Sequence, residues 1–271
     1  MSFQRYPLST IQNASQFIRQ TLVLPTVEQP SRAAATEAEG GNDDDALVPD
    51  SLNALGDLFR VGDMPEDNLP APNTQGRWFV STLDPAEALA KFPGLWLRPG
   101  IRLVTYLRQD ATGGVGATVA LPGLLSTTEY LEAAIEQAAK TDQPPTPMGA
   151  LPNLMAGLDG DGSLASFLSA SIFLREIREL GRFGRYARWI HHRFVAEAPT
   201  QVPWDWRTPI PEDFSPRVVV RQDAEVIVEF YSCRVQKPVA LFRHLDRYPP
   251  NSYTATNQDQ ALAVMASKAP K

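Results

Sequence analysis

The sequence has few of the side chains that hold metals or form disulfides. Among its 271 residues there are one cysteine and three histidines. The single Cys233 excludes an internal disulfide and a zinc or iron–sulfur site built from several cysteines. His191 and His192 are adjacent, so their rings point in different directions on a strand or a helix. With His244 they lack metal-ligand spacing, and we expect hydrogen-bonded structural histidines, with no metal and no cofactor.

Long apolar runs are also missing. No stretch approaches the roughly 18 uninterrupted apolar residues of a transmembrane helix. The start, MSFQRYPLSTIQ, has no apolar core behind a basic end, so we expect no secretory signal. A cytoplasmic protein without a transmembrane segment is the resulting prediction.

Motifs of common enzymes are absent as well. There is no G-x-S-x-G turn, and Cys233 lies in FYSCR, a strand-like stretch where a buried, inert thiol is expected. Asp159 and Asp161 suggest a calcium loop, but its twelfth position is Ala170 rather than glutamate. A helix cap at Asp161 or Ser163 explains the same residues better. An enzyme is therefore the least favoured class of function.

The acidic charge is concentrated near the N-terminus. The chain has 25 basic and 31 acidic residues, and its first 76 residues contain four of the basic and eleven of the acidic ones. Between Pro25 and Val48 there is no aromatic residue and no apolar period, which predicts disorder. We therefore expect an acidic, largely disordered arm over residues 1–76, with a disordered linker over 25–49.

Two short segments of this arm, residues 9–24 and 50–61, have the apolar spacing of amphipathic helices. Stripes of this kind are expected to dock in an apolar groove, on this protein's own core or on a partner. The docking residues are Ile11, Ile18 and Leu22 in the first segment and Leu52, Leu55, Leu58 and Phe59 in the second.

Residues 77–271 are predicted to form a single α+β domain of antiparallel hairpins packed with helices. Alternating apolar residues and turn signals mark the strands, whereas apolar residues three or four apart mark the helices. The expected strands are 77–81, 101–108, 115–121, 218–220, 225–235 and 239–245, and the expected helices are 126–139, 163–180 and 258–268.

The most distinctive feature is a stretch rich in arginine and aromatic residues. Arginine binds carboxylates, phosphates and aromatic faces alike, so the stretch suits an acidic protein surface or an RNA. A solvated helix face is the plainer interpretation, because arginine outnumbers lysine 20 to 5 in the whole chain. The candidate partner-binding residues are Arg175, Arg178, Arg182, Arg185, Arg188 and Trp189.

These features together favour a non-enzymatic adaptor, assembly or regulatory factor that binds another protein, possibly one with an acidic surface. An RNA-binding factor that uses residues 175–193 is the first alternative, and an uncharacterised enzyme is the second. The sequence leaves open whether His191, His192, His244 and Cys233 have a chemical role.

Overall fold

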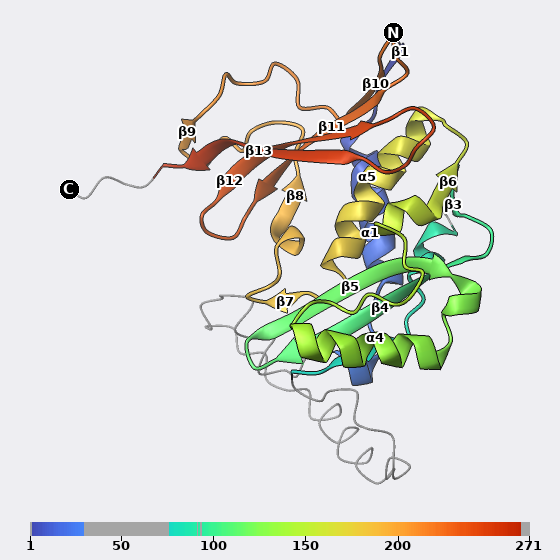
Figure 1. Ribbon diagram of the computed structural model, residues 1–271. Helices are drawn as coiled ribbons and strands as arrows, with labels where there is room; N and C mark the ends of the chain where they lie inside the picture. Colours follow the sequence, from blue (N-terminus) through green and yellow to red (C-terminus); the bar gives the residue numbers. More distant parts are fainter. Residues whose placement is uncertain (1, 30–75, 91, 93, 267–271) are drawn as a thin grey trace, which may run out of the picture.

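The computed structural model describes residues 2–29, 76–90, 92 and 94–266 (Figure 1). Its antiparallel sheets and packed helices confirm the predicted α+β class. The predicted docking residues Leu52, Leu55, Leu58 and Phe59 lie outside the described residues, as does most of the predicted linker. Each helix in the described part of the chain is too short or too polar to cross a membrane.

The larger sheet has the strand order β1-β10-β11-β12-β13-β9, with β8 added to the edge of β11 beyond β10. Every pairing in it is antiparallel. The predicted hairpin over 218–235 is confirmed as β10 and β11. The strands are β1 Ser2–Arg5, β8 His192–Phe194, β9 Trp204–Trp206, β10 Arg217–Val220, β11 Val226–Arg234, β12 Ala240–Tyr248 and β13 Thr256–Met265.

The smaller sheet has the order β2-β4-β5-β7, and a separate pair joins β3 to β6. Its predicted hairpin is confirmed, with Ile101 paired to Pro122 and Asp110 to Gly113. The strands are β2 Trp78–Val80, β3 Leu95–Leu97, β4 Ile101–Asp110, β5 Gly113–Pro122, β6 Leu158–Gly160 and β7 Phe183–Gly184.

The α-helices and sheets form alternating layers (Figure 1). Helices α1 and α5 lie between the two sheets, and α4 covers the outer face of the smaller one. Strand β4 is therefore apolar on both faces: Leu103 belongs to the central core, whereas Val104 and Tyr106 pack under α4. The α-helices are α1 Leu8–Thr21, α4 Thr128–Thr141 and α5 Leu164–Glu179, and the 3₁₀ helices are η1 Thr26–Glu28, η2 Pro85–Leu89, η3 Gly123–Leu125, η4 Leu154–Gly157 and η5 Trp189–His191.

Local signals explain where α5 begins and ends. Ser163 is its N-cap and accepts a hydrogen bond from the Ser166 N–H at 3.2 Å, as the capping prediction required. After the helix, Gly181 has φ +74°, and a Cβ there would lie 2.3 Å from Leu107. A glycine is thus needed both for this turn and for the close approach of α5 to the smaller sheet.

The N-terminal residues are integrated into the domain, which differs from the predicted division at residue 77. Strand β1 extends the larger sheet by pairing with β10, and η1 buries Glu28. Helix α1 packs against α5, with Ile11 and Ile18 fully buried in the central core. The first amphipathic stripe is therefore part of this protein's own core, and residues 25–29 are not part of a linker.

A second correction concerns the C-terminal helix predicted over 258–268. Residues Thr256–Met265 form strand β13, which pairs with β12 on one side and with β9 on the other. Ala261, Ala263 and Ala266 favour a helix locally, but pairing with the open edge of β12 provides backbone hydrogen bonds and buries Leu262 and Ala263.

The packing of α1 predicts a large difference between an apolar position on this helix and one just after it. Replacing the fully buried Ile18 by alanine should lower the free energy of unfolding by about 2–5 kcal/mol, because a cavity forms in the core. Replacing Val23, which is 56% exposed, should change it by only about 0.5 kcal/mol. Urea denaturation of both variants measures this, and equal effects would show that α1 is not part of the core.

Candidate functional site at the C-terminal end of helix α5

Arg175, the first of the predicted partner-binding arginines, is buried rather than displayed. Its Nη1 and Nη2 donate to the two carboxylate oxygens of Asp246 at 2.5 and 2.8 Å, and Nη2 also reaches Asp259 at 3.2 Å. Its guanidinium carbon lies 4.7 Å from the ring centre of Phe230. Burial is the largest single cause and lowers the pKa of Arg175, but Asp246, Asp259 and Tyr248 together raise it above its usual value. The assignment of Arg175 to an exposed basic surface is therefore wrong.

Trp189 also belongs to the interior and not to that surface. It is 9% exposed, and its indole N–H donates to Glu176 Oε1 at 2.9 Å. The other oxygen of Glu176 accepts from Arg19 Nε at 2.8 Å, and Ser15 also donates to this carboxylate. Glu176, which the sequence did not single out, thus ties α1 and η5 to α5.

A polar network that the sequence did not reveal crosses the larger sheet beside Arg175. The Oγ atom of Ser232 lies 2.7 Å from His244 Nε2 and 2.8 Å from His192 Nδ1. His244 Nδ1 lies 2.7 Å from Asp259 Oδ1. This is the serine–histidine–aspartate order of hydrolase triads, but Ser232 is 0% exposed and His244 is 1% exposed. The network joins strands β8, β11, β12 and β13, and of the serine, histidine and aspartate only Asp259 is exposed.

Burial sets the protonation state of the two histidines. It is the main cause that lowers the pKa of His192 to about 3, and the neighbouring His244 and Arg234 act in the same direction. It also lowers the pKa of His244, although the hydrogen bond to Asp259 opposes this shift. Both rings are therefore neutral at physiological pH, and the bonds of His244 and Arg175 hold the pKa of Asp259 below its usual value.

The other residues with reactive side chains have structural surroundings. Cys233 is buried in β11, and burial raises the pKa of its thiol, which disfavours the nucleophilic thiolate. The Nε2 atom of His191 is buried without a hydrogen-bond partner among the described residues. Within those residues, no three His, Cys, Asp or Glu side chains lie close enough together to hold a metal ion.

The later arginines of the predicted set differ from Arg175 in their partners. Arg178 is exposed and reaches only a neutral group, Asn257 Oδ1, at 3.3 Å. The Nε atom of Arg182 is buried, and its guanidinium group has no hydrogen bond or ion pair among the described residues. Arg185 is exposed and pairs with Asp110 at 3.3 Å. Arg188 is exposed, and its backbone N–H donates to Glu179.

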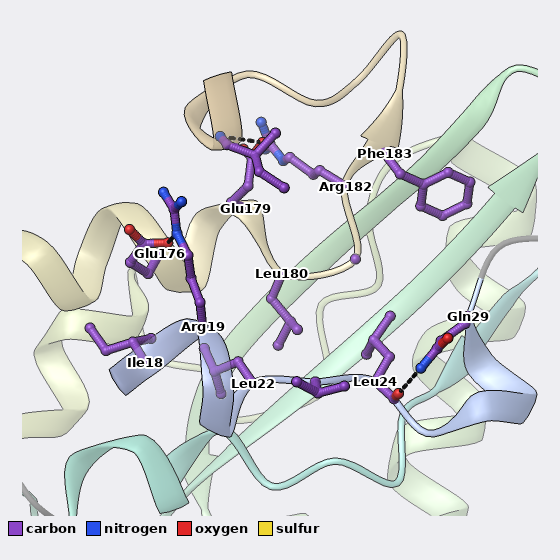
Figure 2. A pocket seen from close by; sticks show the side chains of 13 residues that line it. Ile18, Arg19, Leu22, Leu24, Gln29, Glu176, Glu179, Leu180, Arg182 and Phe183 are labelled. Carbon is purple, nitrogen blue, oxygen red and sulfur yellow. Dashed lines mark hydrogen bonds and ion pairs between the residues drawn. The ribbon is translucent and has the colours of Figure 1, made fainter. Parts of the chain in front are cut away.

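An apolar groove of about 340 Å³ lies where the C-terminal ends of α1 and α5 meet (Figure 2). We call it the α1–α5 groove. The predicted docking residue Leu22 lines it, together with Leu24 and Leu180. Val23 and Ile190, also in the lining, are 56% and 46% exposed. The charged side chains in the lining are Arg19, Glu176, Glu179 and Arg182.

The low pKa of His192 predicts how acid affects stability. The unfolded chain takes up a proton near the ordinary histidine pKa of 6.5, whereas the folded chain resists it until about pH 3. Stability that is complete above pH 6.5 is therefore lost as the pH falls from 6.5 towards 3. His192→Gln removes this contribution, so its unfolding free energy should depend less on pH in that window.

Urea unfolding at a series of pH values measures this dependence. Gln222→Ala, at an exposed position in the turn between β10 and β11, is the control, because it removes no titratable group and should keep the wild-type slope. The same slope in His192→Gln and wild type would contradict the assigned protonation state of His192.

No protein-family model, curated protein or solved structure matches this chain. Its function has to be inferred from its own side chains.

Proposed function

We propose that this protein is a non-enzymatic adaptor, assembly or regulatory factor that binds another protein through the α1–α5 groove. The occupant is an apolar segment of the partner that also carries an acidic residue. The observation that carries this proposal is the position of Arg182, a cation without a carboxylate partner among the described residues, at the side of an apolar groove.

The apolar lining supports a peptide segment as the occupant. Leu180 is 6% exposed and forms part of the floor, whereas Val23 and Ile190 are accessible to a second molecule. Amphipathic segments bind grooves of this kind by burying a few large apolar side chains. The volume of about 340 Å³ suits such side chains.

Charge supports an acidic residue in that segment. Arg19 in the groove is already paired with Glu176, and Glu179 accepts from the backbone N–H groups of Arg188 and Ile190. Of the two cations in the lining, Arg182 is therefore the one without an ion pair among the described residues. A carboxylate from the partner would satisfy its guanidinium fork, an interaction that becomes stronger when water is excluded.

The two alternative functions have weaker support. RNA binding was expected from arginines and aromatic residues on one surface, but Arg175 and Trp189 are buried and paired. The order of Ser232, His244 and Asp259 suggests a hydrolase. A nucleophilic hydroxyl must be accessible to its substrate, however, and Ser232 is completely buried.

The groove can be tested by placing the photo-cross-linker benzoylphenylalanine at Val23 in the full-length chain, in its native cells. The control position is Ile210, which is 61% exposed and does not line the groove. We expect a partner protein cross-linked from position 23 and not from position 210. Mass spectrometry of the cross-linked peptide should identify an apolar segment with an aspartate or glutamate.

The identified segment is then synthesised and its Kd is measured. Val23→Asp and Arg182→Glu should each weaken binding by about tenfold or more. Val23→Asp removes an apolar anchor, and Arg182→Glu removes a charge-assisted contact that is shielded from water. Arg207→Glu, an exposed arginine outside the groove, should bind like wild type. Cross-links only to residues 30–75 of the same chain, or equal binding by Arg182→Glu, would contradict the proposal.

A further inference from the structure

A second cavity, of about 410 Å³, lies on another face of α5, between this helix and strand β5. We call it the α5–β5 cavity. From α5 it is lined by Leu174, Ile177 and Arg178, whereas the α1–α5 groove lies along Glu176, Glu179 and Leu180. Arg182 lines both. We infer that the α5–β5 cavity binds a small organic anion, with its acidic group on Arg178 and Arg182 and its apolar body against the floor.

The two arginines have no acidic partner in the described part of the chain. Arg178 is hydrogen-bonded only to Asn257 Oδ1, and the guanidinium group of Arg182 has neither a hydrogen bond nor an ion pair there. Asp246 binds Arg175 through both oxygens and also accepts from Asn257, whereas Oδ1 of Asp259 is shared by His244 and Arg175. Arg175, whose two Nη atoms bind Asp246, thus differs from Arg178 and Arg182, which have no ion pair among the described residues.

The electrostatic surroundings of Arg178 indicate the same imbalance. The Arg178 side chain is exposed to solvent only in part, and the loss of water around its charged group is the main cause that lowers its pKa; the positive charges of Arg175 and Arg182 act in the same direction. Asp246 and Asp259 oppose the shift without cancelling it. A bound anion would relieve the repulsion between neighbouring guanidinium groups, which gives the cavity a preference for negative charge.

The rest of the lining indicates the chemistry of the ligand's remaining part, the body that carries the acidic group. Leu154, Met155, Leu174 and Ile177 are buried apolar side chains that form the floor. Polar side chains in the lining are occupied, since Thr118 bonds to Thr105 at 2.8 Å and Asn153 accepts from the Ala156 N–H at 3.0 Å. A cavity of this size and composition fits a small molecule with one anionic group, either a carboxylate or a phosphate, on an apolar body.

Arg178 makes this inference independent of the proposed protein-binding function. Arg178 lines the α5–β5 cavity and not the groove, whereas Val23 lines the groove and not the cavity. Variants at these two positions therefore separate failure of one proposal from failure of the other.

Calorimetric titration of the full-length protein tests the cavity with four probes: phenyl phosphate, 3-phenylpropionate, inorganic phosphate and the neutral 3-phenylpropanol. We expect saturable binding of phenyl phosphate or 3-phenylpropionate, and the stronger of the two distinguishes a phosphate from a carboxylate site. Inorganic phosphate and the neutral alcohol should each bind about tenfold more weakly than that probe, because each lacks one half of the ligand.

Substitutions locate the binding. Arg178→Gln and Arg182→Gln should each weaken the better probe by about tenfold, the effect of one charge-assisted hydrogen bond. Two controls should leave the affinity for that probe unchanged. Arg188→Gln changes an exposed arginine that lines neither the groove nor the cavity, and Val23→Asp changes a residue that lines only the groove. The inference is overturned if neither organic anion binds, if the neutral alcohol binds as tightly, or if Arg178→Gln binds like wild type.

Discussion

The buried ion pair between Arg175 and Asp246 is the contact on which the arrangement of the layers depends. An unpaired charge in the interior costs several kcal/mol, so Arg175 requires the two carboxylate oxygens that Asp246 presents from β12. This pairing fixes α5 against the larger sheet at one position along its length. The adjacent Glu176 then binds Arg19 and Trp189, so α1 and η5 are positioned by the same turn of α5.

The same requirement divides the arginines of α5 and the following loop into two groups. Arg175 lies where the helix is covered by the sheet, and its charge is fully compensated. Arg178 lines the cavity near the end of α5, and Arg182, just after the helix, lines both the cavity and the groove; neither forms an ion pair with Asp246. Neither side chain has an ion pair in the described part of the chain, and this is why we propose a partner or a ligand for them. Both proposals therefore concern the C-terminal end of one helix.

The elements that the sequence predicted well are those with local signals. The hairpins β4–β5 and β10–β11 follow from alternation and turn residues, and α5 follows from its apolar period and the cap at Ser163. Strand β1 has only four residues and becomes a strand because β10 offers an edge. Strand β13 contains helix-forming residues, and its conformation is decided by β12.

The candidate site was harder to predict because its partners come from distant strands. Ser232, His244 and Asp259 lie on β11, β12 and β13, and only the register of these strands brings them together. Arg175 was expected on a solvated face because it lies opposite the apolar stripe of its helix. That expectation holds for a helix with one buried side, whereas α5 lies between two sheets and is buried on nearly all sides.

The division between structural and functional arginines can be measured directly. Unfolding free energies of Arg175→Met, Arg178→Met and Arg182→Met, determined by urea denaturation, test it with the same substitution at three positions. Arg175→Met leaves the buried Asp246 without an opposite charge and should cost about 3–5 kcal/mol, whereas the other two should each change stability by about 0.5 kcal/mol. A loss at Arg178 or Arg182 as large as that at Arg175 would contradict the account, because these arginines would then be part of the fold.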